Sequence, residues 1–104
     1  MIHVAFRMNQ DGELVGFYAD CHGDPIVCAA VSALIINTTN SIENLTDADF
    51  VYEYPDKKFI DFRLTREADA GTSLLLRSLK LGLCTIADEY PDDLIVEEVF
   101  VLDK

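Results

Sequence analysis

Residues 24–45 have the sequence DPIVCAAVSALIINTTNSIENL, which opens with a strong signal for the start of a helix. Asp24 can accept hydrogen bonds from the N–H groups of a first helical turn, and Pro25 has no N–H to leave unpaired there. We therefore expect a helix from residue 25 to about residue 44. Its apolar stripe recurs close to the helical period and consists of Val27, Val31, Leu34, Ile35, Ile42 and Leu45.

Strand patterns lie on both sides of this helix. Before it, apolar and polar residues alternate over residues 2–8, which predicts a strand with one buried face. The turn signal Asn9-Gln10-Asp11-Gly12 follows, and a second strand is expected at residues 14–19. After the helix we expect another hairpin, with strands at 50–54 and 59–64 on either side of a turn at 55–58.

A second helix and a further strand follow. Apolar residues at spacings of three and four predict a helix over about residues 67–90, which Pro91 ends. Residues 94–102 predict a strand, in which the adjacent Glu97 and Glu98 break the alternation and indicate a β-bulge. The helix stripe consists of Thr72, Leu75, Leu76, Leu79, Leu83 and Ile86.

The predicted order of elements is β-β-α-β-β-α-β, with no linker or repeat between them. Hairpins make the sheet mostly antiparallel, and two amphipathic helices each need an apolar surface to cover. We therefore expect an α+β fold, a two-layer sandwich in which two helices cover one face of the sheet. At 104 residues the chain has the size of one domain, so residues 1–104 are expected to form a single domain.

The charge of the chain excludes one class of partner. Nineteen acidic and eight basic residues give a formal net charge of −11, which repels a phosphate backbone and attracts a basic protein. We therefore expect no direct contact with nucleic acid. The longest apolar run, residues 26–36, contains Ser32 and is shorter than the roughly 20 residues that a membrane span needs, so no membrane segment is expected either.

The cysteines indicate a reducing compartment. Cys21, Cys28 and Cys84 are an odd number, and no N-terminal signal pattern is present, which favours free thiols in the cytoplasm over a secreted disulfide framework. Two thiols and His22 without a CxxC spacing do not match a metal-site pattern, so we expect neither a metal nor another cofactor. Cys84 lies next to the second helix stripe and is expected to be buried and inert.

Cys28 is the fourth residue of the first predicted helix, counting Pro25 as the first. The unpaired N–H groups and the positive end of the helix dipole favour a thiolate there, and the thiolate is the nucleophilic form. The same N–H groups can bind the oxyanion of a tetrahedral intermediate. His22, six positions earlier, can take the thiol proton if the turn folds back, and Asp20 or Asp24 can orient its ring.

The residue pattern alone leaves other roles open. A cysteine in an apolar helix is commonly a small core residue, and a histidine at a strand end is commonly a polar edge residue. Cys21 also allows a redox-active pair with Cys28, which needs their Cα atoms to lie within about 7 Å. The pattern therefore does not decide between a catalytic and a structural thiol.

The segment IVCAAVSAL at residues 26–34, which follows a histidine at the end of a strand, resembles the signature of the ribosomal-processing cysteine protease family, Prp. The hairpin before this segment and the second helix ending in an acidic stretch also match the family layout. The resemblance implies an endopeptidase that removes the N-terminal extension of a bacterial large-subunit ribosomal protein during ribosome assembly. It further implies a homodimer with Cys28 as nucleophile, His22 as base and Ser32 in a supporting role.

The chain departs from the family pattern in the connection between His22 and Cys28. Five residues lie between them here, where the family usually has a longer, glycine-containing loop, and Cys21 stands where the family usually has glycine. We expect peptide-bond hydrolysis through an acyl-thiol intermediate. The alternative is a non-catalytic module of the same fold that binds a basic protein tail, for example as a strand added to an exposed sheet edge.

Overall fold

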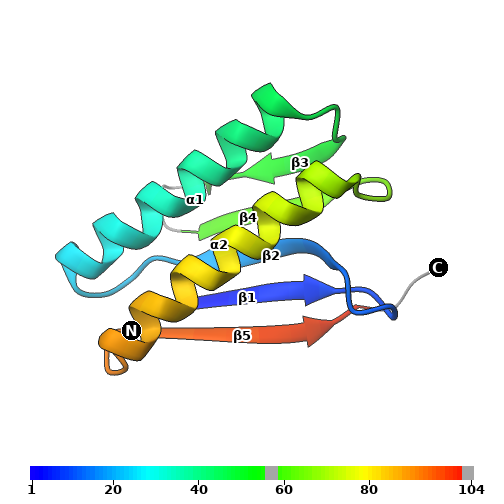
Figure 1. Cartoon of the computed structure of the whole chain (residues 1–104). Coiled ribbons are helices and arrows are strands. Elements are labelled where there is room, and N and C mark those ends of the chain that lie inside the picture. Colours follow the sequence, from blue (N-terminus) through cyan, green and yellow to red (C-terminus); the bar gives the residue numbers. More distant parts are fainter. Residues whose placement is uncertain (56–58, 102–104) are drawn as a thin grey trace.

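A computed structural model describes residues 1–55 and 59–101. The elements follow the predicted order β-β-α-β-β-α-β, and the ribbon shows a sheet with both helices lying across one of its faces (Figure 1). The α+β two-layer sandwich is therefore confirmed. The elements are β1 (Ile2–Met8), β2 (Leu14–Asp20), α1 (Pro25–Leu45), β3 (Phe50–Glu53), β4 (Phe59–Leu64), α2 (Ala70–Glu89) and β5 (Leu94–Phe100).

The sheet has five strands in the order β3-β4-β2-β1-β5. The pairs β1–β2, β2–β4 and β3–β4 are antiparallel, and β5 pairs with β1 in parallel. The sheet is therefore mixed but mostly antiparallel, as expected from the hairpins. Strand β2 lies at its centre, so the connection from β2 to α1 leaves the sheet between β1 and β4.

The core lies between the sheet and the helices. Apolar side chains on the inner face of β1, β2 and β4 meet the buried stripe of each helix, and the rings of Phe17 and Phe62 stack with their centroids 5.1 Å apart. Phe50 of the edge strand β3 stacks on the other side of Phe62 at 4.9 Å. The largest fully buried side chains are Phe6, Phe17, Phe62, Ile2, Ile35, Ile42, Ile60, Leu76, Leu83, Leu94, Val4 and Val31.

Helix α1 has the predicted start but not the whole predicted stripe. Leu45 is 76% exposed, so its expected burial is wrong. The buried side continues instead through Thr38 and Thr39, and the Thr39 hydroxyl donates to the carbonyl oxygen of Ile35 at 2.9 Å, which satisfies this polar group inside the core. By length and composition α1 could also cross a membrane, but it packs on the sheet as a core helix does.

The predicted bulge in the last strand is also wrong. Strand β5 pairs with β1 without interruption from Ile2↔Leu94 to Met8↔Phe100, so Glu97 and Glu98 do not form a bulge. They are exposed because β5 is an edge strand. The register shift lies on the other side of β1, where β2 meets Arg7 and Met8.

The boundaries of the other elements differ by a few residues. Helix α2 begins at Ala70 rather than at residue 67, because the Asp69 carboxylate accepts a hydrogen bond from the Thr72 N–H at 2.7 Å and caps the helix there. Strand β3 ends at Glu53 and β5 at Phe100, one and two residues earlier than predicted. The predicted turn residues 56–58 and strand residue 102 lie outside the described residues.

Gly16 allows two central strands to approach closely. A Cβ atom at this position would collide with the main-chain carbonyl oxygen of Phe62 in β4. We expect Gly16→Ala to lower the free energy of unfolding by about 1 to 3 kcal/mol, because the strands would have to separate. Urea unfolding followed by circular dichroism measures this change.

Gly71→Ala in α2 is the matched control. A Cβ atom there meets its nearest neighbour, Asp69 Oδ1, at an ordinary 3.4 Å, and alanine favours helix by up to about 1 kcal/mol over glycine. This variant is expected to be as stable as the unmodified protein or slightly more stable. Equal stability of Gly16→Ala and the unmodified protein would contradict the close approach.

Candidate active site

The start of α1 fixes the place of Cys28. The Asp24 carboxylate accepts hydrogen bonds from the N–H groups of Ile26 at 3.0 Å and Val27 at 3.1 Å, and the Asp24 carbonyl oxygen accepts the N–H of Cys28 at 2.8 Å. With proline at the first position, these contacts close the first turn. Cys28 is therefore held one turn into the helix, as the sequence predicts.

The same contacts correct the expectation of an oxyanion site. The N–H groups of Ile26, Val27 and Cys28 were expected to be available donors, but each already has an acceptor in Asp24. A backbone N–H has one hydrogen to donate, so these groups cannot bind an oxyanion in this conformation. Such binding requires the Asp24 carboxylate to move away.

The thiol of Cys28 points toward the chain that leaves β2. Its Sγ donates to the carbonyl oxygen of Cys21 at 3.1 Å and lies 3.9 Å from the hydroxyl oxygen of Ser32, one helical turn later. Cys28 is half-buried and packs against the core cluster without belonging to its fully buried members. Cys28 is thus not among the fully buried core residues, and the Ser32 hydroxyl lies beside its sulfur.

His22 is held by an acidic neighbour. Its Nδ1 lies 2.6 Å from Asp20 Oδ1, and its main-chain N–H donates to the same oxygen at 3.1 Å. The ring is 55% exposed and meets the Phe59 ring edge-on with the centroids 5.8 Å apart. The hydrogen bond from the His22 side chain holds the pKa of Asp20 below its ordinary value. With Nδ1 occupied by a carboxylate, Nε2 remains available to accept a proton.

Of the two acidic residues predicted to orient the His22 ring, Asp20 is the one that contacts it. Asp24 is occupied in capping α1. No hydrogen bond joins His22 to Cys28 among residues 1–55 and 59–101, because the two side chains leave the chain on different sides. Side chains alternate along a strand, so Asp20 and His22 share the outer side with Phe59, while Cys21 follows Ala19 toward the helices.

Cys21 is a neighbour of Cys28 that catalysis does not explain. Burial raises the pKa of its thiol, contact with the Ser32 hydroxyl lowers it, and the charges of Cys28 and Asp20 raise it further. The pKa of Tyr52 is also raised, first by burial and then by nearby Tyr54 and Cys21. Cys21 is therefore a half-buried thiol with a raised pKa, close to Tyr52.

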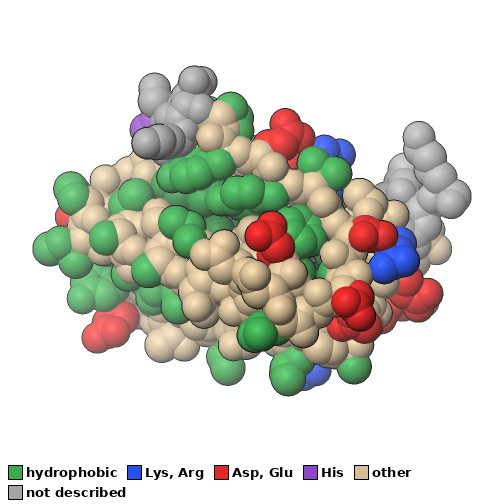
Figure 2. All heavy atoms as spheres, turned by 90° about the horizontal axis from the view of Figure 1, so that it is seen from above, with side chains coloured by type: hydrophobic (Ala, Val, Ile, Leu, Met, Phe, Trp, Pro, Cys, Tyr) green, Lys and Arg blue, Asp and Glu red, His purple; other side chains and the backbone are tan. Residues whose placement is uncertain are grey.

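A face with hydrophobic side chains is visible where α1 is seen from above. Figure 2 shows these side chains gathered in a hollow, with acidic side chains beside it. Tyr52 and Tyr54 of the β3 side and Cys21 and Cys28 of the β2–α1 connection are partly buried groups that pack against the core. Cys28 thus lies in a partly buried position with apolar neighbours.

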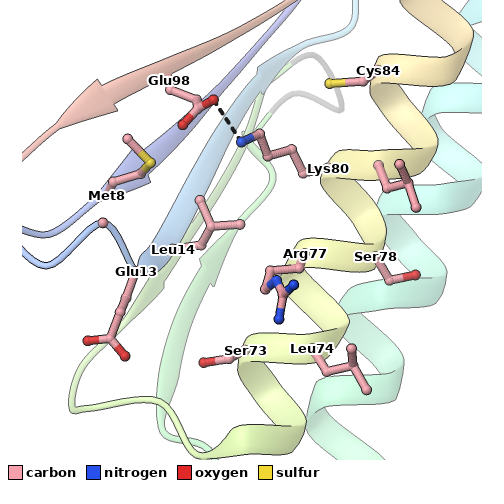
Figure 3. Close-up of a pocket in the computed structure, with 12 residues that line it drawn as sticks. Met8, Glu13, Leu14, Ser73, Leu74, Arg77, Ser78, Lys80, Cys84 and Glu98 are labelled. Carbon is pink, nitrogen blue, oxygen red and sulfur yellow. Dashed lines mark ion pairs between the residues drawn. The ribbon is translucent and has the colours of Figure 1, made fainter.

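The prediction that Cys84 is buried is wrong. It is half-buried in α2 and lines a hollow between this helix and the sheet, together with Leu14, Lys80 and Glu98 (Figure 3). Lys80 Nζ and Glu98 Oε1 form an ion pair at 2.7 Å across it. This hollow contains neither Cys28 nor His22 and is therefore separate from the candidate active site. Within the described part of the chain, no group of three or more histidine, cysteine or acidic residues could hold a metal ion.

Comparison with known proteins connects this geometry to a family. Residues 1–95 match the family described as Cysteine protease Prp. The Ribosomal processing cysteine protease Prp of Staphylococcus aureus is 30% identical over 107 aligned residues, which cover 90% of this chain and 95% of that protein.

Solved structures agree with this match. A crystal structure of an essential ribosomal processing protease Prp from S. aureus, in complex with a covalently linked product peptide, superposes with a TM-score of 0.89 at 27% identity and covers 95% of this chain and 100% of that one. The complex of that protein with a substrate peptide gives a TM-score of 0.88 at 25% identity, with the same coverage.

The contact between Asp20 and His22 predicts the titration of one carboxylate. Asp20 should titrate below its ordinary pKa of 3.8, and His22→Ala should move its pKa upward. Because the folded-state pKa is the lowered one, the stability from this contact is present above pH 3.8 and is lost as the pH falls through the folded value. NMR of the carboxyl carbons against pH measures both.

Asp69 serves as the internal control for this titration. Its pKa is lowered mainly by the hydrogen bond from the Thr72 main chain, so it should be the same in the unmodified protein and in His22→Ala. An Asp20 titration that does not respond to His22→Ala would show that the two side chains are not in contact.

Proposed function

Because this chain belongs to the Prp family of cysteine proteases, we propose that it cleaves a bacterial large-subunit ribosomal protein and removes an N-terminal extension from it during ribosome assembly. The match over residues 1–95 carries this proposal. It is supported by the S. aureus Prp structures with a substrate peptide and with a covalently linked product peptide. In this chain we assign Cys28 as the nucleophile and His22 as the base.

The proposed reaction uses few groups. His22 Nε2 takes the proton of the Cys28 thiol, and Sγ attacks the carbonyl carbon of the scissile peptide bond. The tetrahedral intermediate then expels the amine, which receives the proton from His22, and leaves an acyl-thioester on Cys28. Water, deprotonated by His22, hydrolyses the thioester and restores the thiol. In the resting arrangement Asp20 holds Nδ1, which leaves Nε2 as the ring atom that takes the thiol proton.

The chain must rearrange before this reaction can start. The Cys28 thiol has to leave the Cys21 carbonyl oxygen, and the His22 ring has to turn from the outer side of the sheet toward the helix. Residues 21–23 lie between the end of β2 and the Asp24 cap of α1, so their main chain can change without breaking either element. Substrate binding can supply the energy for this change through contacts made away from the scissile bond.

The surface of the chain fits a basic substrate. A net charge of −11 attracts a positively charged segment and accelerates its encounter with the protein. The hydrophobic hollow in Figure 2, with acidic side chains beside it, offers apolar contact and charge complementarity on one face. We assign the partly buried Tyr52 and Tyr54 to the contact with the substrate peptide.

Replacing the nucleophile tests the assignment. Cys28→Ala is expected to lower the rate of cleavage of a peptide that carries the N-terminal extension by at least about a thousandfold, because no other described group replaces the thiol. Cleavage is followed by mass spectrometry of the two products. Cys84→Ala, in the separate hollow on α2, is the matched control and should cleave at the normal rate. Normal cleavage by Cys28→Ala would rule out Cys28 as the nucleophile.

The resting geometry also supports a second candidate, a module that binds the same basic segment without cutting it. The occupied N–H groups at the start of α1 and the outward His22 ring are the observations in its favour. The two functions differ in one product. Rapid acid quenching of the protein with the extension peptide should give Cys28 acylated by the peptide, whereas a binding module would leave the protein mass unchanged.

We further propose that the protein works in the cytoplasm as a homodimer. The support is the family resemblance for the dimer and the pattern of free cysteines for the compartment. Light scattering of the purified protein should give twice the chain mass of 11.6 kDa. A mass of one chain at micromolar concentration would exclude a stable dimer.

A further inference from the structure

Cys21 and Cys28 meet at the end of β2. The Sγ of Cys28 lies 3.1 Å from the carbonyl oxygen of Cys21, both cysteines are half-buried, and both are free thiols. Each packs against the core cluster from the helix side of the sheet. The proposed peptidase mechanism uses Cys28 and gives the Cys21 thiol no role.

The short connection between β2 and α1 explains why the thiols of Cys21 and Cys28 both lie on the helix side of the sheet. Asp20 is the last residue of β2 and points outward with His22, so the intervening Cys21 points inward. Ser32 lies beside both thiols. Its hydroxyl oxygen is 3.9 Å from Cys28 Sγ, and the same hydroxyl contacts the Cys21 thiol. The nearest reactive side chain to the Cys28 thiol along this connection is thus another thiol and not the imidazole.

We propose that Cys21 and Cys28 form an intramolecular disulfide when the protein meets a peroxide, and that this bond reversibly blocks Cys28. The regulatory part rests on the proposed function of Cys28 as nucleophile. The disulfide itself depends only on the position of the two thiols.

The oxidation balances in two steps. The Cys28 sulfur attacks one oxygen of hydrogen peroxide, the O–O bond breaks, and Cys28 sulfenic acid and water form. The Cys21 sulfur then attacks the Cys28 sulfur and displaces the hydroxyl group as a second water. Two thiols and one hydrogen peroxide give one disulfide and two waters. A dithiol reductant reverses the change by thiol–disulfide exchange and leaves as its own disulfide.

The environment of the Cys21 thiol indicates which cysteine is oxidised first. Burial raises the pKa of Cys21, and a protonated thiol reacts slowly with peroxide, so Cys28 is oxidised first and Cys21 resolves it. A disulfide needs Cα atoms within about 7 Å, and the contact between Cys28 Sγ and the Cys21 main chain places the two residues side by side. Residues 21–23, which belong to neither β2 nor α1, allow the remaining adjustment.

The bond would also act on the histidine. With Cys21 tied to Cys28 on the helix side, the adjacent His22 is held on the outer side against Asp20 and Phe59. The disulfide therefore removes the nucleophile and prevents the rearrangement that brings the base to it. Both effects end when the bond is reduced.

The test treats the full chain with a small excess of hydrogen peroxide, alkylates the remaining thiols and analyses non-reduced peptides by mass spectrometry. The expected product is one peptide containing residues 21–28 that carries no alkyl group and has lost about 2 Da, while Cys84 is fully alkylated. Cleavage of the extension peptide should fall in step with this product and return after treatment with dithiothreitol. Cys84→Ser should behave like the unmodified protein.

Other outcomes would overturn the proposal. These are an alkylated Cys21 beside a sulfinic Cys28, a bond to Cys84, or a crosslink between two chains. In Cys21→Ser the oxidised peptide should be absent, and peroxide should drive Cys28 to the sulfinic acid, which dithiothreitol does not rescue. The peptide mass does not depend on activity. A disulfide without any effect on cleavage would thus count against the proposed function of Cys28, and absence of the disulfide in an active enzyme would count against the switch alone.

Discussion

Asp24 closes the first turn of α1, and the position of the Cys28 thiol depends on this cap. Its carboxylate and carbonyl oxygen together accept three main-chain N–H groups, which sets where the helix begins and thus which side chain faces the end of β2. The cap has a chemical consequence as well. The N–H groups that were predicted to bind an oxyanion already donate to Asp24, so in this conformation they stabilise the start of the helix instead.

The connection between β2 and α1 is short, so the alternation of side chains along β2 determines whether Cys21 or His22 faces the helices. Strand β2 is paired on both sides as far as Asp20, so the alternation of its side chains extends to the residues just beyond it. Because of that alternation, the His22 side chain points to the outer side of the sheet and the Cys21 side chain points to the helix side. The family relationship and the resting geometry are thus compatible, provided that residues 21–23 change conformation when a peptide binds.

Much of the fold could be predicted because its signals are local. Asp24-Pro25 located the start of α1, and the apolar alternation located β1. Long-range features could not be predicted: strand order and the parallel β1–β5 pair depend on contacts that no local pattern records. Glu97 and Glu98 illustrate this, since an edge strand and a bulge expose acidic residues equally well. For the candidate site, Cys28, His22 and Asp20 were proposed from the residue pattern, and Ser32 from the family resemblance. The directions in which these side chains point could not be predicted, because they depend on the residue at which β2 ends.

The parallel pairing of β1 with β5 determines when the chain can complete its folding during synthesis. Strand β1 is made first, yet one of its two edges stays open until β5 has been synthesised, and the buried Ile2 pairs with Leu94 only then. Contacts between distant parts of a chain form slowly, since the intervening loop must close first. On a translating ribosome the nascent chain therefore carries an unfinished sheet for most of its synthesis. Maturation is expected to be completed only after β5 emerges from the exit tunnel, so a slow step late in translation would prolong the time for which β1 is open to aggregation.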